Sequence, residues 1–144
     1  QSRSSAASDV YKRQFEMKFE HFAINVEDPV TVAKWYVDHL QMKIVRQSEG
    51  PVFMHFLADS TDRVVMELYN NPPELIPDYA AQDPQVLHMA FAVEDMEGTI
   101  KRLEGAGAQL VGGPGPTPAG DTLAMLRDPW GFAIQLTQRA KPMV

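Results

Sequence analysis

An internal repeat constrains this chain more than any other feature. Residues 21–28 (HFAINVED) match residues 88–95 (HMAFAVED) at an offset of 67, with five of the eight positions identical. Further along, residues 64–68 (VVMEL) match residues 132–136 (FAIQL) at an offset of 68. Two matches in the same order and at nearly the same offset indicate a duplicated structural unit rather than a chance similarity.

The repeat divides the chain of 144 residues into segments. Residues 1–16 are rich in Ser and Ala and lack apolar periodicity, so we expect them to be a non-native or disordered leader ahead of Met17. The remaining segments are a first module, a Pro- and Asn-rich linker, a second module and a short tail, at residues 17–70, 71–85, 86–138 and 139–144.

Each module reads as a strand, a helix and then three strands. In the first module, alternating polar and apolar residues predict a strand at 19–26, and Asp28 followed by Pro29 is typical of a helix start. The helix is expected to bury Val32, Trp35, Tyr36 and Leu40. The other predicted strands are 42–46, 52–58 and 63–69. The second module repeats the pattern with a strand at 87–93, a helix at 95–104 and strands at 109–111, 122–126 and 132–137.

Two connections in the second module carry turn or loop signals. Residues 128–131 (DPWG) have Asp, Pro and Gly at the positions that a type I turn favours, which predicts a tight hairpin before the last strand. Residues 112–120 are rich in Gly and Pro, and we expect them to form a flexible connector. The whole pattern predicts an α+β fold made of two tandem βαβββ modules.

Four polar residues occupy equivalent places in the two modules. His21 corresponds to His88 at the start of each first strand, and Glu67 corresponds to Gln135 in each last strand. Because neighbouring residues of a strand face opposite ways, all four should project from the sheet face that the helices do not cover. Two modules could then curl around a cavity that these four side chains share.

The arrangement resembles the vicinal oxygen chelate superfamily of glyoxalases, bleomycin-resistance proteins and extradiol dioxygenases, over essentially all of residues 17–138. The resemblance implies a cupped, partly open mixed β-sheet with the helices on its outside. It also implies a divalent metal ion held by side chains from the first and last strands, here His21, Glu67, His88 and Gln135. Members of the superfamily often pair their modules across subunits, which implies a homodimer with the site either within one chain or shared between two.

The donor types agree with a metal site. A carboxylate in the apolar run around Glu67 needs a partner, and a cation beside two imidazoles supplies one. Two imidazoles, one carboxylate and one amide oxygen suit Zn²⁺, Ni²⁺, Co²⁺, Mn²⁺ or Fe²⁺, and the sequence does not choose among them. Family enzymes commonly carry Glu where this chain has Gln135. An amide cannot act as a base, so the proton-transfer role falls to Glu67.

These residues favour a glyoxalase-like, metal-dependent enzyme of the lyase, isomerase or dioxygenase type that chelates a small oxygenated metabolite. The alternative is a metal-free protein of the bleomycin-resistance type that binds and sequesters a small molecule. Two further residues are candidate substrate contacts. His55 lies in a predicted middle strand, and Tyr69 shares the face of Glu67, with core packing as an equal interpretation for Tyr69.

Composition excludes several other classes. The net charge is −6 and no basic stripe is present, which disfavours nucleic-acid binding. No apolar run is long enough to span a bilayer, so no membrane partner is expected. The chain has no cysteine, which excludes thiol nucleophiles and zinc fingers and fits the reducing cytoplasm in which we expect the protein.

Overall fold

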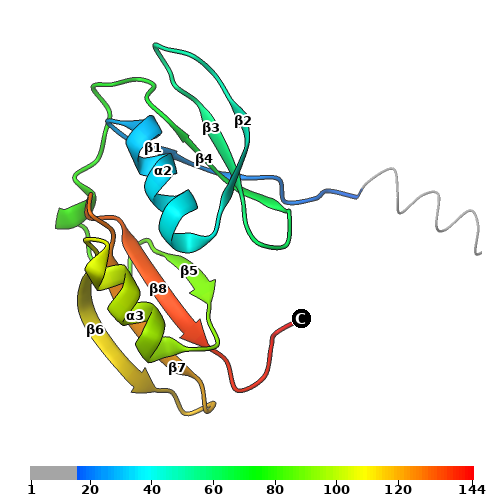
Figure 1. Cartoon of the computed structure of the whole chain (residues 1–144), viewed down its shortest axis with the longest axis vertical. Helices are drawn as coiled ribbons and strands as arrows, with labels where there is room; N and C mark the ends of the chain where they lie inside the picture. Colours follow the sequence, from blue (N-terminus) through cyan, green and yellow to red (C-terminus); the bar gives the residue numbers. More distant parts are fainter. Residues whose placement is uncertain (1–15) are drawn as a thin grey trace, which may run out of the picture.

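The computed structural model of the chain describes residues 16–144, so the expected leader at 1–16 lies, except for Glu16, outside the described residues. Within the described residues, the fold consists of two four-stranded sheets, each with one α-helix (Figure 1). The elements of the first are β1 (Phe22–Asn25), α2 (Pro29–Leu40), β2 (Lys43–Gln47), β3 (His55–Ala58) and β4 (Val64–Tyr69). Those of the second are β5 (Met89–Ala92), α3 (Met96–Gly105), β6 (Gln109–Pro116), β7 (Thr122–Arg127) and β8 (Ala133–Gln138), and a short 3₁₀ helix η1 (Tyr79–Ala81) lies between them.

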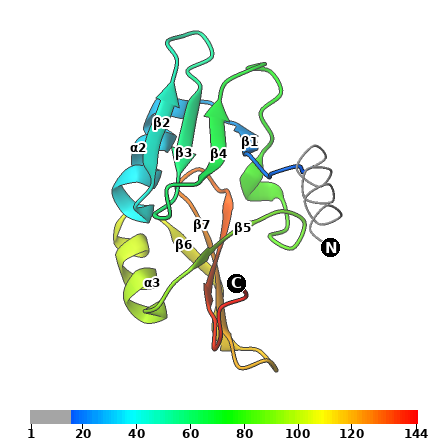
Figure 2. The same ribbon diagram turned by 90° about the vertical axis from the view of Figure 1, so that its right-hand side faces the viewer.

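The two sheets have the same topology. Their strand orders are β1-β4-β3-β2 and β5-β8-β7-β6. β1 pairs with β4 and β5 with β8 in parallel, and the other neighbouring strands are antiparallel. The prediction of an α+β fold with two tandem βαβββ modules is therefore confirmed. Figures 1 and 2 show α2 and α3 on the same side of the molecule, one above the other, each against its own sheet. Within one chain the two sheets remain separate, with β1 and β5 each at an outer edge.

The helices begin where the sequence predicts. Asp28 accepts a hydrogen bond from the Thr31 amide at 3.2 Å and caps α2, with Pro29 in its first turn. The bonds from Thr31 hold the pKa of the Asp28 carboxyl below its usual range. Asp95 caps α3 in the same way, through the Gly98 amide at 3.0 Å. Of the predicted apolar stripe of α2, all but Leu40 are buried, and Leu40 is partly buried against the same core.

One predicted connector is a strand. Residues 112–120 were expected to form a flexible Gly/Pro loop, but β6 continues to Pro116 and pairs with β7. The pairing skips residues at two places, between Leu110 and Gly112 and between Gly112 and Gly115. Proline lacks an amide donor but is tolerated on an edge strand, and β6 is the edge of its sheet. The tight turn predicted at residues 128–131 is confirmed by the hydrogen bond from the Gly131 amide to Asp128 O at 2.9 Å.

A buried polar contact joins the modules. The Tyr36 hydroxyl on α2 donates to Asp128 Oδ2 at 2.8 Å, and Asp128 Oδ1 accepts the amides of Trp130 and Phe132 at 3.0 and 2.9 Å. Nearby, Trp35 Nε1 donates to Ala106 O at 2.9 Å. These bonds link α2 of the first module to the turn before β8 and to the end of α3, so they fix how the two modules sit against each other.

Burial raises the pKa of the Asp128 carboxyl, although the hydrogen bonds from Tyr36 and the backbone work against the rise. Because the folded chain then holds the proton more firmly than the unfolded chain, the contribution of Asp128 to stability is full at acidic pH and is lost as pH rises through the raised pKa. The Asp128→Asn protein keeps the acceptor for both amides and has no such loss. We therefore expect the free energy of unfolding of the Asn variant to increase relative to that of the natural protein as pH rises from about 4.

Urea unfolding at a series of pH values measures this difference. Asp128→Ala should cost about 3 kcal/mol at acidic pH, since three hydrogen bonds worth about 1 kcal/mol each disappear, and the cost should fall as pH rises. The exposed Asp78 serves as the control, and Asp78→Asn should show no comparable trend. A stability difference between the natural and Asn proteins that is independent of pH would contradict the assignment.

The linker is held against both modules. The Asn25 amide nitrogen donates to the carbonyls of Pro72 and Leu75 at 2.8 and 3.1 Å, and the Tyr79 hydroxyl donates to Asn25 O at 2.6 Å. From the second module, Arg127 donates to Tyr79 O at 3.1 Å and to further carbonyls of the linker and the turn.

Among residues 16–144, no helix is both long enough and apolar enough to cross a membrane.

Candidate functional site

The first pair of polar residues is brought together by the parallel register of β1 and β4. Ala23 lies opposite Glu67, so His21, two residues earlier, shares the face of Glu67. His21 Nε2 lies 3.2 Å from Glu67 Oε2, and both side chains are largely shielded, with exposed fractions of 28% and 18%. Glu67 pairs with Phe56 of the neighbouring strand β3. The Phe56 ring contacts the His21 ring edge-on, with 5.0 Å between the ring centroids. A cation between the imidazole and the carboxylate would contact both.

The second pair repeats this geometry in the second module. Ala90 lies opposite Gln135 in the parallel register of β5 and β8, and His88 precedes Ala90 by two residues. Met125 of β7 is opposite Gln135 on the other side, where the first module has Phe56. The two modules therefore place a histidine and a carboxylate or amide at identical register positions. We refer to His21 with Glu67 as the first half-site and to His88 with Gln135 as the second half-site.

In both histidines, Nδ1 lies within hydrogen-bond distance of an oxygen of another residue. His88 Nδ1 lies 2.8 Å from Pro84 O, and a carbonyl can only accept, so Nδ1 carries the hydrogen and Nε2 keeps its lone pair. His21 Nδ1 lies 2.6 Å from Glu20 Oε2 and His21 Nε2 lies 3.2 Å from Glu67 Oε2, so each nitrogen of this ring faces a carboxylate. A metal-binding histidine usually has its second nitrogen fixed by a carboxylate or a carbonyl. The donor set of this chain therefore fits a divalent cation.

The half-sites do not meet within one chain. Throughout the part of the chain that the structure describes, no three His, Asp or Glu side chains lie close enough together to hold a metal ion. His88 is therefore not placed beside His21 and Glu67. The hydrogen bonds of Tyr36 and Trp35 hold the modules side by side, and β1 and β5, which follow the two histidines, both keep an unpaired outer edge.

The two candidate substrate contacts lie on opposite faces of the first sheet. His55 pairs with the core residue Leu68, so it lies on the face that α2 covers; it is buried, and its Nδ1 bonds Phe53 O at 2.6 Å. The structure does not bring it to Glu67. Tyr69, by contrast, follows Glu67 by two residues on the same face and pairs with Asn25. Of the two, only Tyr69 is in a position to line the face that carries the first half-site.

Two features near the half-sites carry no signal in the sequence. One is Glu20, whose carboxylate bonds His21. The other is a cleft of about 790 Å³ between the modules. It is lined by His88 and by Phe91 of β5 from the second module, and by Phe22 and Leu40 of the first module. Neither could be read from periodicity, because one depends on a side-chain rotamer and the other on how the modules dock.

Comparison with known proteins gives a consistent assignment. Residues 18–136 match the Glyoxalase/Bleomycin resistance protein/Dioxygenase superfamily. The lactoylglutathione lyase of Haemophilus influenzae is 28% identical over 129 residues, which cover 85% of this chain and 93% of that protein. A probable lactoylglutathione lyase from a Synechocystis species is 30% identical over 129 residues, covering 82% of this chain and 92% of the relative.

Solved structures agree with this comparison. Glyoxalase I from Zea mays superposes with a TM-score of 0.71 and 25% identity over 91% of this chain, which spans about half (48%) of the maize chain. TnmS3, an antibiotic binding protein from Streptomyces, has a TM-score of 0.65 and 22% identity, covers 88% of this chain and 98% of its own, and supports the fold alone. The chain belongs to the glyoxalase/bleomycin resistance protein/dioxygenase superfamily.

Proposed function

We propose that this protein is a glyoxalase-like, metal-dependent enzyme of the lyase or isomerase type that acts on a small oxygenated metabolite. Its metal ligands are His21, Glu67, His88 and Gln135. One observation carries the proposal. The two modules present a histidine, with Nδ1 beside an oxygen acceptor, and a side-chain oxygen at the same register positions, on the sheet face that the helices leave open. The lactoylglutathione lyases among its relatives support the reaction class.

We further propose that the complete site forms in a homodimer, from the first half-site of one chain and the second half-site of the other. Within a chain the half-sites are apart, while the strands beside the histidines, β1 and β5, have free edges that can receive a second chain. The small residues Ala23, Ala90 and Ala92 of these strands are exposed on the same open face. A C₂ dimer places each such surface against its counterpart and creates two equivalent sites.

The roles of the side chains follow from their chemistry. A bound divalent cation supplies Lewis acidity that polarises substrate oxygens. Glu67 is the one carboxylate among the four ligands, so it is the group able to take a proton from the substrate, whereas the Gln135 amide can only donate and accept hydrogen bonds or coordinate. Phe56 and Met125, beside Glu67 and Gln135, offer an apolar floor for the carbon skeleton. Tyr69 offers a hydroxyl on the same face as Glu67.

The neutral Gln135 also favours one alternative, a metal-free protein that sequesters a small molecule. A site with a single carboxylate holds a cation less firmly than one with two, and the apolar floor suits an aromatic ligand equally well. Under this alternative, His21 and Glu67 contact each other directly as a hydrogen-bonded pair.

Elemental analysis of the purified protein, followed by thermal unfolding with EDTA and with each divalent metal, distinguishes the two functions. The enzyme should contain about one metal ion per chain, and EDTA should lower its Tm. Returning the right metal at a hundredfold excess over its Kd adds about 2.7 kcal/mol, which is roughly 8 °C for a domain of this size. A metal-free protein whose Tm responds neither to EDTA nor to any metal would support the sequestering protein instead.

A further inference from the structure

Glu20 is an exposed carboxylate, yet its side chain makes one specific contact. Glu20 Oε2 lies 2.6 Å from Nδ1 of His21, its neighbour in the chain. This is the short distance of a hydrogen bond between an N–H donor and a charged oxygen. The other nitrogen of the same ring, Nε2, lies 3.2 Å from Glu67 Oε2. The imidazole is therefore held between two carboxylates, of which only Glu67 lies in a strand of the sheet.

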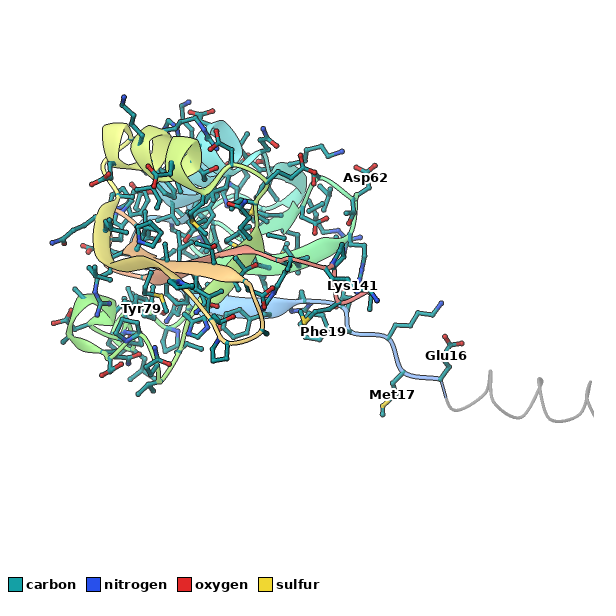
Figure 3. All side chains as sticks on the ribbon, turned by 90° about the horizontal axis from the view of Figure 1, so that it is seen from below. Glu16, Met17, Phe19, Asp62, Tyr79 and Lys141 are labelled. Atoms are coloured by element: carbon teal, nitrogen blue, oxygen red, sulfur yellow. The ribbon has the colours of Figure 1, made fainter. Side chains whose placement is uncertain are left out.

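Two contacts together determine the position of the His21 ring. The edge-on contact with Phe56, at an interplanar angle of 84°, sets the plane of the ring. Of the two carboxylates that face the ring nitrogens, Glu20 makes the shorter contact, at 2.6 Å against 3.2 Å for Glu67, which favours hydrogen on Nδ1. The segment before Glu20 extends away from the sheets, and Met17 and Phe19 in it are exposed (Figure 3). Glu20 is thus placed where the chain enters the fold, just before β1.

In the second half-site, Nδ1 of the histidine has a different kind of partner. His88 Nδ1 bonds the backbone carbonyl of Pro84, at the end of the linker, and the residue before His88 is Leu87. The outer partner of His88 is therefore neutral, while that of His21 is anionic. A charged acceptor draws the hydrogen of Nδ1 more strongly and makes Nε2 a better electron-pair donor.

We propose that Glu20 is a positioning residue, which draws the hydrogen of His21 to Nδ1 and so makes Nε2, the nitrogen that faces Glu67, a stronger metal ligand. The inference rests on the proposed metal site, and it assigns to Glu20 a role that its exposure and its position outside the strands would not suggest. It also makes the two imidazoles unequal, with the first half-site bearing the anionic support.

The test compares Glu20→Ala and Glu20→Gln with the natural protein in two measurements. Calorimetric titration with Zn²⁺ should show Glu20→Ala weakened ten- to hundredfold, the usual cost of losing an outer-shell partner. Glu20→Gln keeps an oxygen that can accept the Nδ1 hydrogen and should lose less. Nitrogen NMR of the imidazole in metal-free protein at alkaline pH should show more hydrogen on Nδ1 in the natural and Gln proteins, and a shift of the hydrogen to Nε2, which faces Glu67, in the Ala protein.

Glu16→Ala is the matched control, because it removes an exposed carboxylate four residues earlier in the same segment. It should leave both the affinity and the tautomer unchanged. Unchanged Zn²⁺ affinity and tautomer in Glu20→Ala would overturn the inference. A Gln variant that keeps the tautomer but loses as much affinity as the Ala variant would overturn the positioning role, because only the negative charge of Glu20 would then support the ligand.

The two proposals fail in different ways. If the natural protein binds no Zn²⁺ or other divalent metal, the proposed function falls, while the tautomer measurement still decides whether Glu20 orients His21. If the natural protein binds metal and Glu20→Ala binds it equally well with the same tautomer, only the role of Glu20 falls. Unchanged thermal unfolding of all variants will show that lost affinity does not reflect lost folding.

Discussion

Mixing the His21→Ala and His88→Ala proteins is expected to restore tight metal binding that neither variant has alone. Each substitution removes one of four ligands, and since an outer-shell change already costs 10- to 100-fold in affinity, the loss of a ligand should exceed about a hundredfold. If the site spans two chains, a mixed dimer holds one site lacking both histidines and one site lacking neither. Random pairing makes about half of the dimers mixed, so about a quarter of all sites should recover.

A site within one chain predicts no recovery, because each site would still lack the histidine that is replaced in its own chain. Calorimetric titration of the co-refolded mixture counts the recovered sites, and native mass spectrometry confirms that mixed dimers have formed. His39→Ala is the control because His39 packs against Trp35 at the end of α2, and it should bind metal as the natural protein does. Mixed dimers without any recovered site would refute the shared site.

The experiment addresses what the sequence left open. The repeat predicted the fold because each module is a local unit whose strand and helix periods are independent of the other module. The alternation in β1 and β4 also placed His21 and Glu67 on one face, and the parallel register brings their side chains into contact. How the modules dock depends on non-local contacts such as that of Tyr36 with Asp128, which no periodicity encodes. Whether the half-sites meet within a chain was therefore beyond the sequence.

Two local predictions show where pattern reading stops. The Gly and Pro residues of 112–120 suggested a loop, but an edge strand tolerates residues that an inner strand excludes, so composition alone could not tell β6 from a connector. The apolar run around His55 has no clear alternation, so the sequence does not tell which face of the sheet carries His55. Its pairing with Leu68 places it on the core face. Glu20 was missed for the opposite reason, because an exposed carboxylate is ordinary until a hydrogen bond identifies it.

Gln135→Glu is the second substitution from which we expect a large effect. The two proposed functions predict opposite effects, a gain for the enzyme and a loss for the metal-free protein. Gln135 and Glu67 occupy equivalent positions, so Gln135→Glu gives the second half-site the carboxylate that the first already has. If Gln135 is a ligand, an anionic oxygen replaces a neutral one beside a divalent ion. Unit charges about 4 Å apart attract by about 4 kcal/mol at an effective dielectric constant of 20, so even after desolvation a gain of tenfold or more in metal affinity is expected.

The same substitution can add a base. A carboxylate at position 135 is able to take a proton that an amide cannot, so glyoxalase-type activity should rise in the Glu variant if Glu67 alone limits proton transfer. The Gln135→Asn protein is the matched control, since it keeps the neutral amide and shortens the side chain. It should bind metal more weakly than the natural protein and should not gain activity.

In a metal-free sequestering protein, Gln135→Glu has the opposite effect. No cation is present to neutralise the new charge, and a second carboxylate facing that of Glu67 on a shared cavity costs free energy through like-charge repulsion and desolvation. The Glu variant should then unfold at lower temperature than the natural protein near neutral pH and recover as the pH falls, because protonating one carboxyl removes the repulsion. Calorimetric metal titration and thermal unfolding of the two proteins decide between these outcomes. Unchanged or weaker metal binding by the Glu variant would remove Gln135 from the coordination sphere and leave three ligands at the site.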